Sequence, residues 1–151
     1  MPKKTVLKQR DIERKVSKRL KKYKKLNYLG QFAMFMGTAQ LLEIGLKNLL
    51  IARYGYKVEQ IEKKTLGWTT AELEKNQLRT DFVKLLKSLV EKRNYVAHEL
   101  LANEMIKETL LGGLKPKKHY SKDLRFLHKS ILEVEQVMVL FNWTSRNDGW
   151  S

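Results

Sequence analysis

The sequence predicts an all-α protein: a single-domain helical bundle of four to five main helices with an extra basic helix at its N-terminus. Apolar residues recur at three- and four-residue spacings along most of the chain. No stretch of useful length alternates as a strand would, and only two prolines and eight glycines interrupt the 151 residues. A chain of this length encloses one hydrophobic core. We therefore expect a basic N-terminal helix at 1–26 packed on the body, a bundle at 27–142 and a tail at 143–151.

The N-terminal segment 1–25 carries twelve Lys or Arg and only two acidic residues. Four apolar residues in it recur at helical spacing: Ile12, Val16, Leu20 and Tyr23. We expect this stripe to pack on the body, because residues three and four apart lie on one side of a helix. The exposed lysines, with Lys18 and Lys22 among them, either attract RNA or only keep the helix solvated. The segment lacks the apolar stretch and cleavage site of a secretory signal.

The later elements are predicted in order from periodicity and end signals. A long apolar helix is expected at 27–54, with Gly55 as its C-cap. Thr69 and Glu72 have the spacing of a capping box, which predicts a short helix at 70–75. A third long helix is expected at 78–111, and Ser121 has the residue type of an N-cap for the last helix.

Composition narrows the function classes. The formal net charge of +15 and a pI near 10 favour a polyanionic partner, because lysines near phosphates release condensed counterions. The absence of cysteine removes disulfides and thiolate metal sites, so we expect a cytoplasmic protein. The apolar window 29–46 contains Gln31, Gln40 and Glu43, which favours a buried helix over a membrane span. No metal or cofactor motif is present in the sequence, and neither is expected.

A cation lies in line with the core stripe of the third long helix. Arg93 follows Leu86 and Leu89 at helical spacing, so it must meet an anion, open onto a cleft or lie at a subunit interface. Asn94 and His98 are four residues apart and share a neighbouring face. On a straight helix, however, Arg93 and His98 differ in direction by about 140° and lie about 7.5 Å apart along the axis. A helix distortion or a two-fold dimer would bring them together.

The stretch Lys92-Arg93-Asn94-Tyr95-Val96-Ala97-His98-Glu99-Leu100 resembles the motif of the HEPN superfamily, in which Arg and a polar residue precede His. The segment Lys64-Thr65-Leu66-Gly67 is also similar to one found in several HEPN branches. The resemblance implies a homodimer that cuts RNA without metal at a cleft between the two motif helices. It carries the catalytic roles to Arg93 and His98, with Asn94 in support. The branch regulated by nucleotidyltransferase antitoxins has Tyr two residues after the His, where this chain has Leu100.

These features predict a metal-independent endoribonuclease, acting as a toxin or an anti-phage effector on RNA, with an antitoxin or nucleotidyltransferase as a further partner. His98 would transfer protons, since imidazole titrates near neutral pH, and Arg93 would hold the phosphate. Lys18, Lys22 and Lys92 are expected to contact RNA. Glu43, the one carboxylate in an apolar helix, either faces Arg93 or pairs with Lys47. The alternatives are a non-catalytic HEPN module that binds nucleotide or nucleic acid or docks a nucleotidyltransferase, and a basic helical adaptor with a structural arginine.

Overall fold

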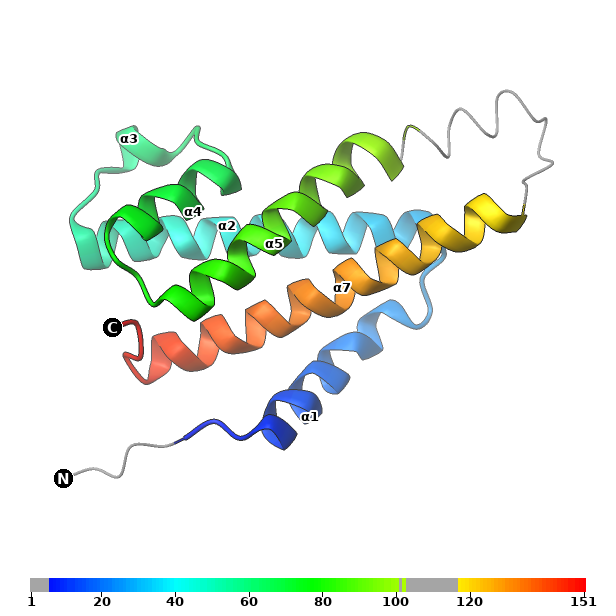
Figure 1. Cartoon of the computed structure of the whole chain (residues 1–151), viewed down its shortest axis with the longest axis horizontal. Coiled ribbons are helices and arrows are strands. Elements are labelled where there is room, and N and C mark those ends of the chain that lie inside the picture. Colours follow the sequence, from blue (N-terminus) through cyan, green and yellow to red (C-terminus); the bar gives the residue numbers. More distant parts are fainter. Residues whose placement is uncertain (1–5, 101, 103–116) are drawn as a thin grey trace.

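The computed structural model describes residues 6–100, 102 and 117–151, with the backbone alone at 117–121. All regular secondary structure in this part of the chain is helical (Figure 1). The all-α, single-domain class predicted from the sequence is confirmed.

The basic N-terminal helix α1 (Gln9–Leu20) continues into a short 3₁₀ turn, η1 (Lys21–Tyr23). Its apolar stripe meets the body as predicted, because Val16 and Tyr23 are buried and Leu20 packs against the core. Helix α1 lies along α7 (Lys117–Arg146), and the lysines on its outer side stay exposed.

Helix α2 (Tyr28–Tyr54) has the two ends that the sequence predicts. The Asn27 side chain accepts a hydrogen bond from the Gly30 N–H at 2.8 Å, which satisfies one of the free donors of the first turn. Gly55 follows the last turn with φ 72°, a left-handed conformation that glycine adopts without a side-chain clash.

The connection after α2 holds a single turn, α3 (Val58–Ile61), and then α4 (Leu66–Lys75). Helix α4 begins one turn earlier than expected. Its N-cap is Thr65, whose side chain accepts from the Trp68 N–H at 3.1 Å. The predicted capping box at Thr69 is wrong, because Thr69 is buried inside the helix and donates its hydroxyl proton to the Thr65 carbonyl at 2.8 Å.

Helix α5 (Thr80–Tyr95) passes directly into a π-helical turn, η2 (Val96–Leu100), and the rest of the expected helix to 111 lies largely outside the described residues. Helix α7 begins at Lys117, so Ser121 lies one turn inside it and is not the N-cap. It runs to Arg146, four residues past the predicted boundary at 142. The tail is therefore shorter than expected, and Trp150 within it is buried against Phe82 and Phe141.

Helix α7 contacts α1, α2 and α5 and so occupies the middle of the bundle (Figure 1). Helix α4 packs against α5 and also contacts α2. The largest fully buried apolar side chains come from α2, α4, α5 and α7 and from the segments between them: Phe35, Leu42, Leu46, Leu50, Ile61, Leu73, Leu78, Leu86, Leu89, Leu100 and Leu127. None of the described helices combines the length and hydrophobicity needed to cross a bilayer.

A buried carboxylate joins the basic N-terminal helix to α7. Glu135 is 0% exposed, and its two oxygens meet the Arg19 guanidinium and the Lys22 ammonium, each at 2.5 Å. The Tyr23 hydroxyl donates a third contact at 2.7 Å. Burial by itself would raise the pKa of Glu135, but Lys22, Tyr23 and Arg19 together lower it below its usual value. Glu135 is therefore ionised at neutral pH and fully paired.

Two glycines of α2 give a matched prediction. A Cβ on Gly45 would lie 2.9 Å from the ring of Phe141, whereas one on Gly37 would meet nothing within 4 Å. Gly37→Ala is expected to raise the free energy of unfolding by about 0.5–1 kcal/mol through helix propensity. Gly45→Ala gains the same helix propensity, but its methyl group overpacks α2 against α7. The free energy of unfolding should therefore fall by about 1 kcal/mol net. Urea unfolding measures both; equal stabilisation by the two variants would contradict this packing.

Candidate functional site

Arg93 occupies a core position of α5 near the end of the helix. It is spaced three or four residues from Leu89 and Val96 on the same stripe, and both of these neighbours are 0% exposed. Arg93 itself is half-buried. The helix therefore places Arg93 in line with the core stripe, while part of its side chain stays accessible to solvent.

The polar contact of the Arg93 guanidinium is local. Its Nη1 donates a hydrogen bond to Asn94 Oδ1 at 3.3 Å. Among the described residues no carboxylate pairs with Arg93. A half-buried guanidinium that meets only a neutral amide keeps most of its capacity to bind an anion such as a phosphate.

The π-helical turn falls between Arg93 and His98. Its hydrogen bonds join residues five apart, so each turn holds more residues than in an α-helix and each residue rotates the chain less. The directions of Arg93 and His98 are therefore closer than in the straight helix expected from the sequence. His98 is exposed, as is Asn94, whose amide oxygen contacts the guanidinium of Arg93.

The first turn of α4 lies beside this part of α5. A Cβ on Gly67 would lie 3.4 Å from Cγ1 of Val90, and Val90 precedes Arg93 and Asn94 by three and four residues. The ammonium of Lys64 lies over the ring of Trp68, 5.4 Å from its centroid. The segment Lys64-Thr65-Leu66-Gly67, singled out in the sequence, is thus placed about one helical turn from the motif.

Glu43 does not face Arg93, and that expectation is corrected. Its carboxylate pairs with Lys47 one turn later on α2 at 3.2 Å, which was the alternative reading of the sequence. The Lys47 ammonium also donates to the carbonyls of Glu62 and Lys64, at 3.3 and 2.7 Å. Glu43 and Lys47 therefore secure the loop that leads into α4.

The three lysines expected to contact RNA differ in their surroundings. Lys18 is exposed in the last turn of α1. Lys22 pairs with buried Glu135, and Lys92 pairs with Glu133 at 2.5 Å and donates to Ser88 Oγ at 3.0 Å. Glu133 thus balances the charge of Lys92, whereas the single charge of Glu135 is shared between Lys22 and Arg19. Lys18 and Lys22 are exposed to solvent, and Lys92 is half-buried.

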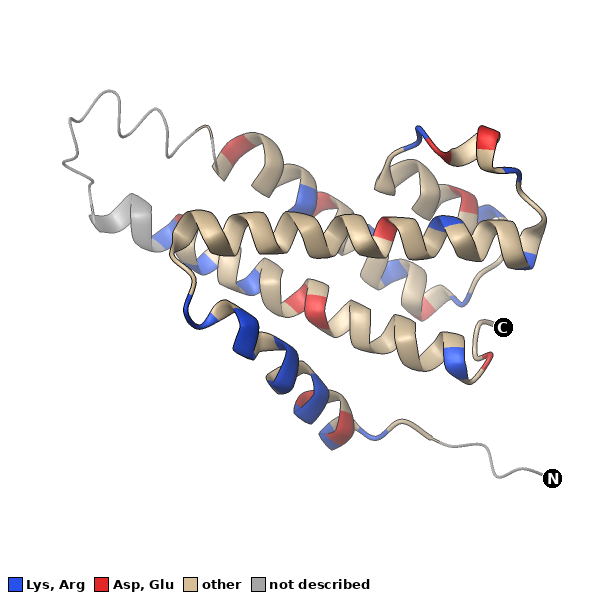
Figure 2. Ribbon diagram, turned by 180° about the vertical axis from the view of Figure 1, so that it is seen from behind, with Lys and Arg blue, Asp and Glu red and all other residues tan. Residues whose placement is uncertain are grey.

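Other cations gather where α2 and α7 begin and α5 ends. Figure 2 shows Lys and Arg on the turn before α2, on α7 directly after the part drawn in grey, and near the end of α5, all at one end of the bundle. The exposed basic residues of these segments are Lys21, Lys24, Lys25, Lys122, Arg125 and Lys129. Acidic residues also lie here, with Glu99 exposed and Asp123 buried. Arg93, Asn94 and His98 therefore lie at the same end of the bundle as these basic residues.

Comparisons with protein-family models, curated proteins and solved structures found no significant match to this chain. The likeness to HEPN proteins thus rests on the residues of the motif and of the Lys64–Gly67 segment. In the described part of the chain, no three His, Cys, Asp or Glu side chains lie close enough together to hold a metal ion.

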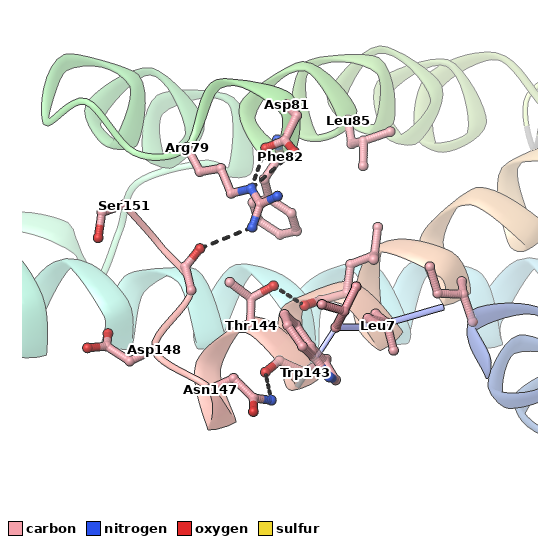
Figure 3. Close-up of a pocket in the computed structure, with 14 residues that line it drawn as sticks. Leu7, Arg79, Asp81, Phe82, Leu85, Trp143, Thr144, Asn147, Asp148 and Ser151 are labelled. Atoms are coloured by element: carbon pink, nitrogen blue, oxygen red, sulfur yellow. Dashed lines mark hydrogen bonds and ion pairs between the residues drawn. The ribbon is translucent and has the colours of Figure 1, made fainter. Parts of the chain in front are cut away.

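A larger cavity of about 790 Å³ opens at the other end of the bundle, between the N-terminal segment, the start of α5 and the end of α7 (Figure 3). Its polar side chains already have partners. Arg79 Nε meets both oxygens of Asp81 at 2.8 and 3.0 Å, and its Nη1 donates to the Gly149 carbonyl at 3.3 Å. Asp148 pairs with Arg53 at 3.1 Å. This cavity offers apolar walls and paired charges, without the acid and base of a hydrolytic site.

The sequence reasoning missed a second, smaller pocket beside the motif. It has a volume of about 240 Å³, and its walls come from the end of α5 and the start of α7: Tyr95, Lys122, Asp123, Arg125, Phe126 and Lys129. The spacing of Lys122, Arg125 and Lys129 on one helix face was a signal in the sequence. Tyr95 could not be linked to them without knowing that α7 lies beside α5.

Proposed function

We propose that the protein is a metal-independent endoribonuclease of HEPN type, with Arg93 and His98 as its reacting pair. The observation that carries the proposal is the half-buried guanidinium of Arg93, which among the described residues donates a hydrogen bond to Asn94 and pairs with no carboxylate, followed by a π-helical turn on which His98 is exposed. π-Helical turns are rare and occur often at functional sites. The basic end of the bundle supplies the attraction for RNA.

The chemistry is an internal transfer at phosphorus. The ribose 2′-oxygen forms a bond to the adjacent phosphorus, while the bond from phosphorus to the 5′-oxygen of the next nucleotide breaks. A proton leaves the 2′-hydroxyl and a proton reaches the departing 5′-oxygen, and His98 serves these transfers. Arg93 binds the phosphate oxygens as their negative charge grows, and Asn94 orients the guanidinium. The products carry a 2′,3′-cyclic phosphate and a 5′-hydroxyl.

A homodimer fits this chemistry, because two protons move and each motif supplies one imidazole. Two motif helices related by a two-fold axis would place one His98 on each side of the scissile phosphate. On a straight helix Arg93 and His98 would point in widely different directions, and the π-helical turn reduces this difference. The dimer would supply the second proton-transfer group. In the cell, such an enzyme would act as a toxin or an anti-phage effector.

A non-catalytic module that binds nucleotide or nucleic acid, or docks a nucleotidyltransferase, is the second candidate. The basic and aromatic pocket beside Tyr95 favours it, since such a surface retains RNA without any chemistry. The structural-arginine alternative is less favoured, because Arg93 has no carboxylate partner in the described part of the chain.

Incubation of end-labelled total RNA with the wild-type protein in EDTA tests the proposal. We expect cleavage whose products resist 3′-end ligation until the 2′,3′-cyclic phosphate is opened by acid and the phosphate removed. Sedimentation of the same preparation is expected to show a dimer. Binding of RNA without cleavage would favour the second candidate, and cleavage that requires added divalent metal would overturn the mechanism.

A further inference from the structure

The small pocket between α5 and α7 combines the two features of a single-strand binding surface. Tyr95 is 38% exposed and its ring packs on Phe126, with the centroids 4.5 Å apart and the planes inclined by 53°. The exposed part of the Tyr95 ring is accessible from solvent, and an accessible aromatic ring can stack on any unpaired base. An exposed aromatic side chain at the end of a basic bundle is therefore suited to nucleobase contact.

Charge around the pocket fits the backbone that carries such a base. Lys122, Arg125 and Lys129 occupy positions i, i+3 and i+7 of α7, which places them along one face of the helix. Lys122 and Lys129 are exposed, so their ammonium groups can follow successive phosphates. Asp123 also lines the pocket and is 7% exposed. Its carboxylate reduces the net positive charge of the pocket but hardly reaches solvent. The cations form a row beside the aromatic pair.

The pocket adjoins the motif through Tyr95 itself. Tyr95 follows Asn94 directly and precedes His98 by three residues, less than one turn of the π-helical segment. Tyr95 faces α7, while His98 is exposed on the π-helical turn. A nucleotide held at Tyr95 would therefore lie next to the one whose phosphate meets His98.

We propose that the pocket of Tyr95, Phe126, Lys122 and Lys129 holds one unpaired nucleotide of single-stranded RNA, adjacent to the nucleotide at which the chain is cut. The inference rests on the proposed function for its RNA substrate and adds a preference for single strands. Bases inside a duplex are stacked on one another and cannot reach Tyr95, whereas bases of loops and ends can.

Fluorescence anisotropy with a labelled ten-nucleotide RNA and a matched duplex tests the pocket, in EDTA and with the His98→Ala variant so that the RNA stays intact. Tyr95→Ala is expected to weaken single-strand binding about tenfold, within the range for loss of one stacked base, and to leave duplex binding unchanged. Tyr95→Phe keeps the ring and should bind as the parent does. Thermal unfolding of each variant checks that the contact with Phe126 is not needed for folding.

A charge variant keeps the test independent of the aromatic packing. Lys122→Ala with Lys129→Ala should weaken single-strand binding and reduce the salt dependence by about 1.4 in the logarithmic slope, the value for two phosphate contacts. Lys57→Ala with Lys84→Ala removes the same charge from exposed lysines near the other end of the bundle and should change binding less.

The outcomes separate this pocket from the enzyme proposal. Equal binding by Tyr95→Ala and its parent, or an equal loss for single strand and duplex, would overturn the pocket even if wild-type protein cuts RNA. A selective loss of single-strand binding would support the pocket even if no RNA is cut. An equal effect of the two lysine pairs would show general attraction by charge and would also overturn it.

Discussion

His98→Ala is expected to slow RNA cleavage by about 10²–10⁴-fold, the usual contribution of a positioned proton-transfer group. Because His98 is exposed, its removal should leave the thermal unfolding temperature unchanged. RNA binding should also persist, since the cations of the basic end remain. Single-turnover cleavage in EDTA measures the rate, and anisotropy measures binding on the same preparation.

Arg93→Ala should lower cleavage by about 10²–10³-fold, because the growing charge on the phosphate loses its main donor. Arg93→Lys keeps the charge without the forked geometry and is expected to recover only part of this loss. His128→Ala provides a matched control, since His128 is also exposed and its Nε2 lies 2.9 Å from Gln31 of α2, outside the motif. If His98→Ala and His128→Ala cut RNA equally fast, the assignment of His98 is wrong.

The largest effect on stability is expected at Glu135. Removal of both cations, Arg19→Ala with Lys22→Ala, would leave a fully buried carboxylate with only the Tyr23 hydroxyl as a charge-stabilising partner. Breaking a buried pair costs about 3–5 kcal/mol, and we expect about 3 because both cations are about a third exposed, at 31% and 33%. Glu135→Gln should cost less, about 1–2 kcal/mol, because Arg19 and Lys22 can turn toward water. Urea unfolding measures both variants, and a loss under 1 kcal/mol in the double variant would contradict the buried pairing.

The same cluster predicts a pH dependence. The pKa of Glu135 in the folded protein is lowered, so the stability it supplies is present above the ordinary glutamate value of 4.5 and is lost as the pH falls through the lower folded value. The advantage of wild type over Glu135→Gln in unfolding free energy should therefore shrink as the pH falls from above 4.5 through the lower folded value. A constant advantage over this range would show that Glu135 is not ionised in the fold.

The elements that the sequence predicted well are those specified by neighbouring residues. Both ends of α2 were predicted, because Asn27 and Gly55 end the helix through contacts and backbone conformations within the adjacent turn. The start of α4 was misplaced because Thr65 and Thr69 both have the residue type of an N-cap, and the choice depends on the burial of Thr69. The start of α7 was misplaced for a similar reason, since Ser121 is also acceptable inside a helix.

The candidate site was predictable only in part. The spacing of Leu86, Leu89 and Arg93 placed the cation on the core stripe, and the structure agrees. The π-helical turn was not predicted, because the three- and four-residue apolar spacing was read as one straight α-helix through this segment. The partners of Glu43, Lys22 and Lys92 were equally hidden, since a long side chain pairs with whichever helix the fold sets opposite it.

The pairing of Glu135 with Arg19 and Lys22 changes what the basic N-terminal segment can do. A loosely tethered basic tail would search a wide volume and gather polyanions in many orientations. Detachment of this helix would strand an ionised group in an apolar interior, so the helix stays docked on α7. Its exposed lysines, such as Lys15 and Lys18, therefore keep a fixed position along the bundle instead of moving with a free tail.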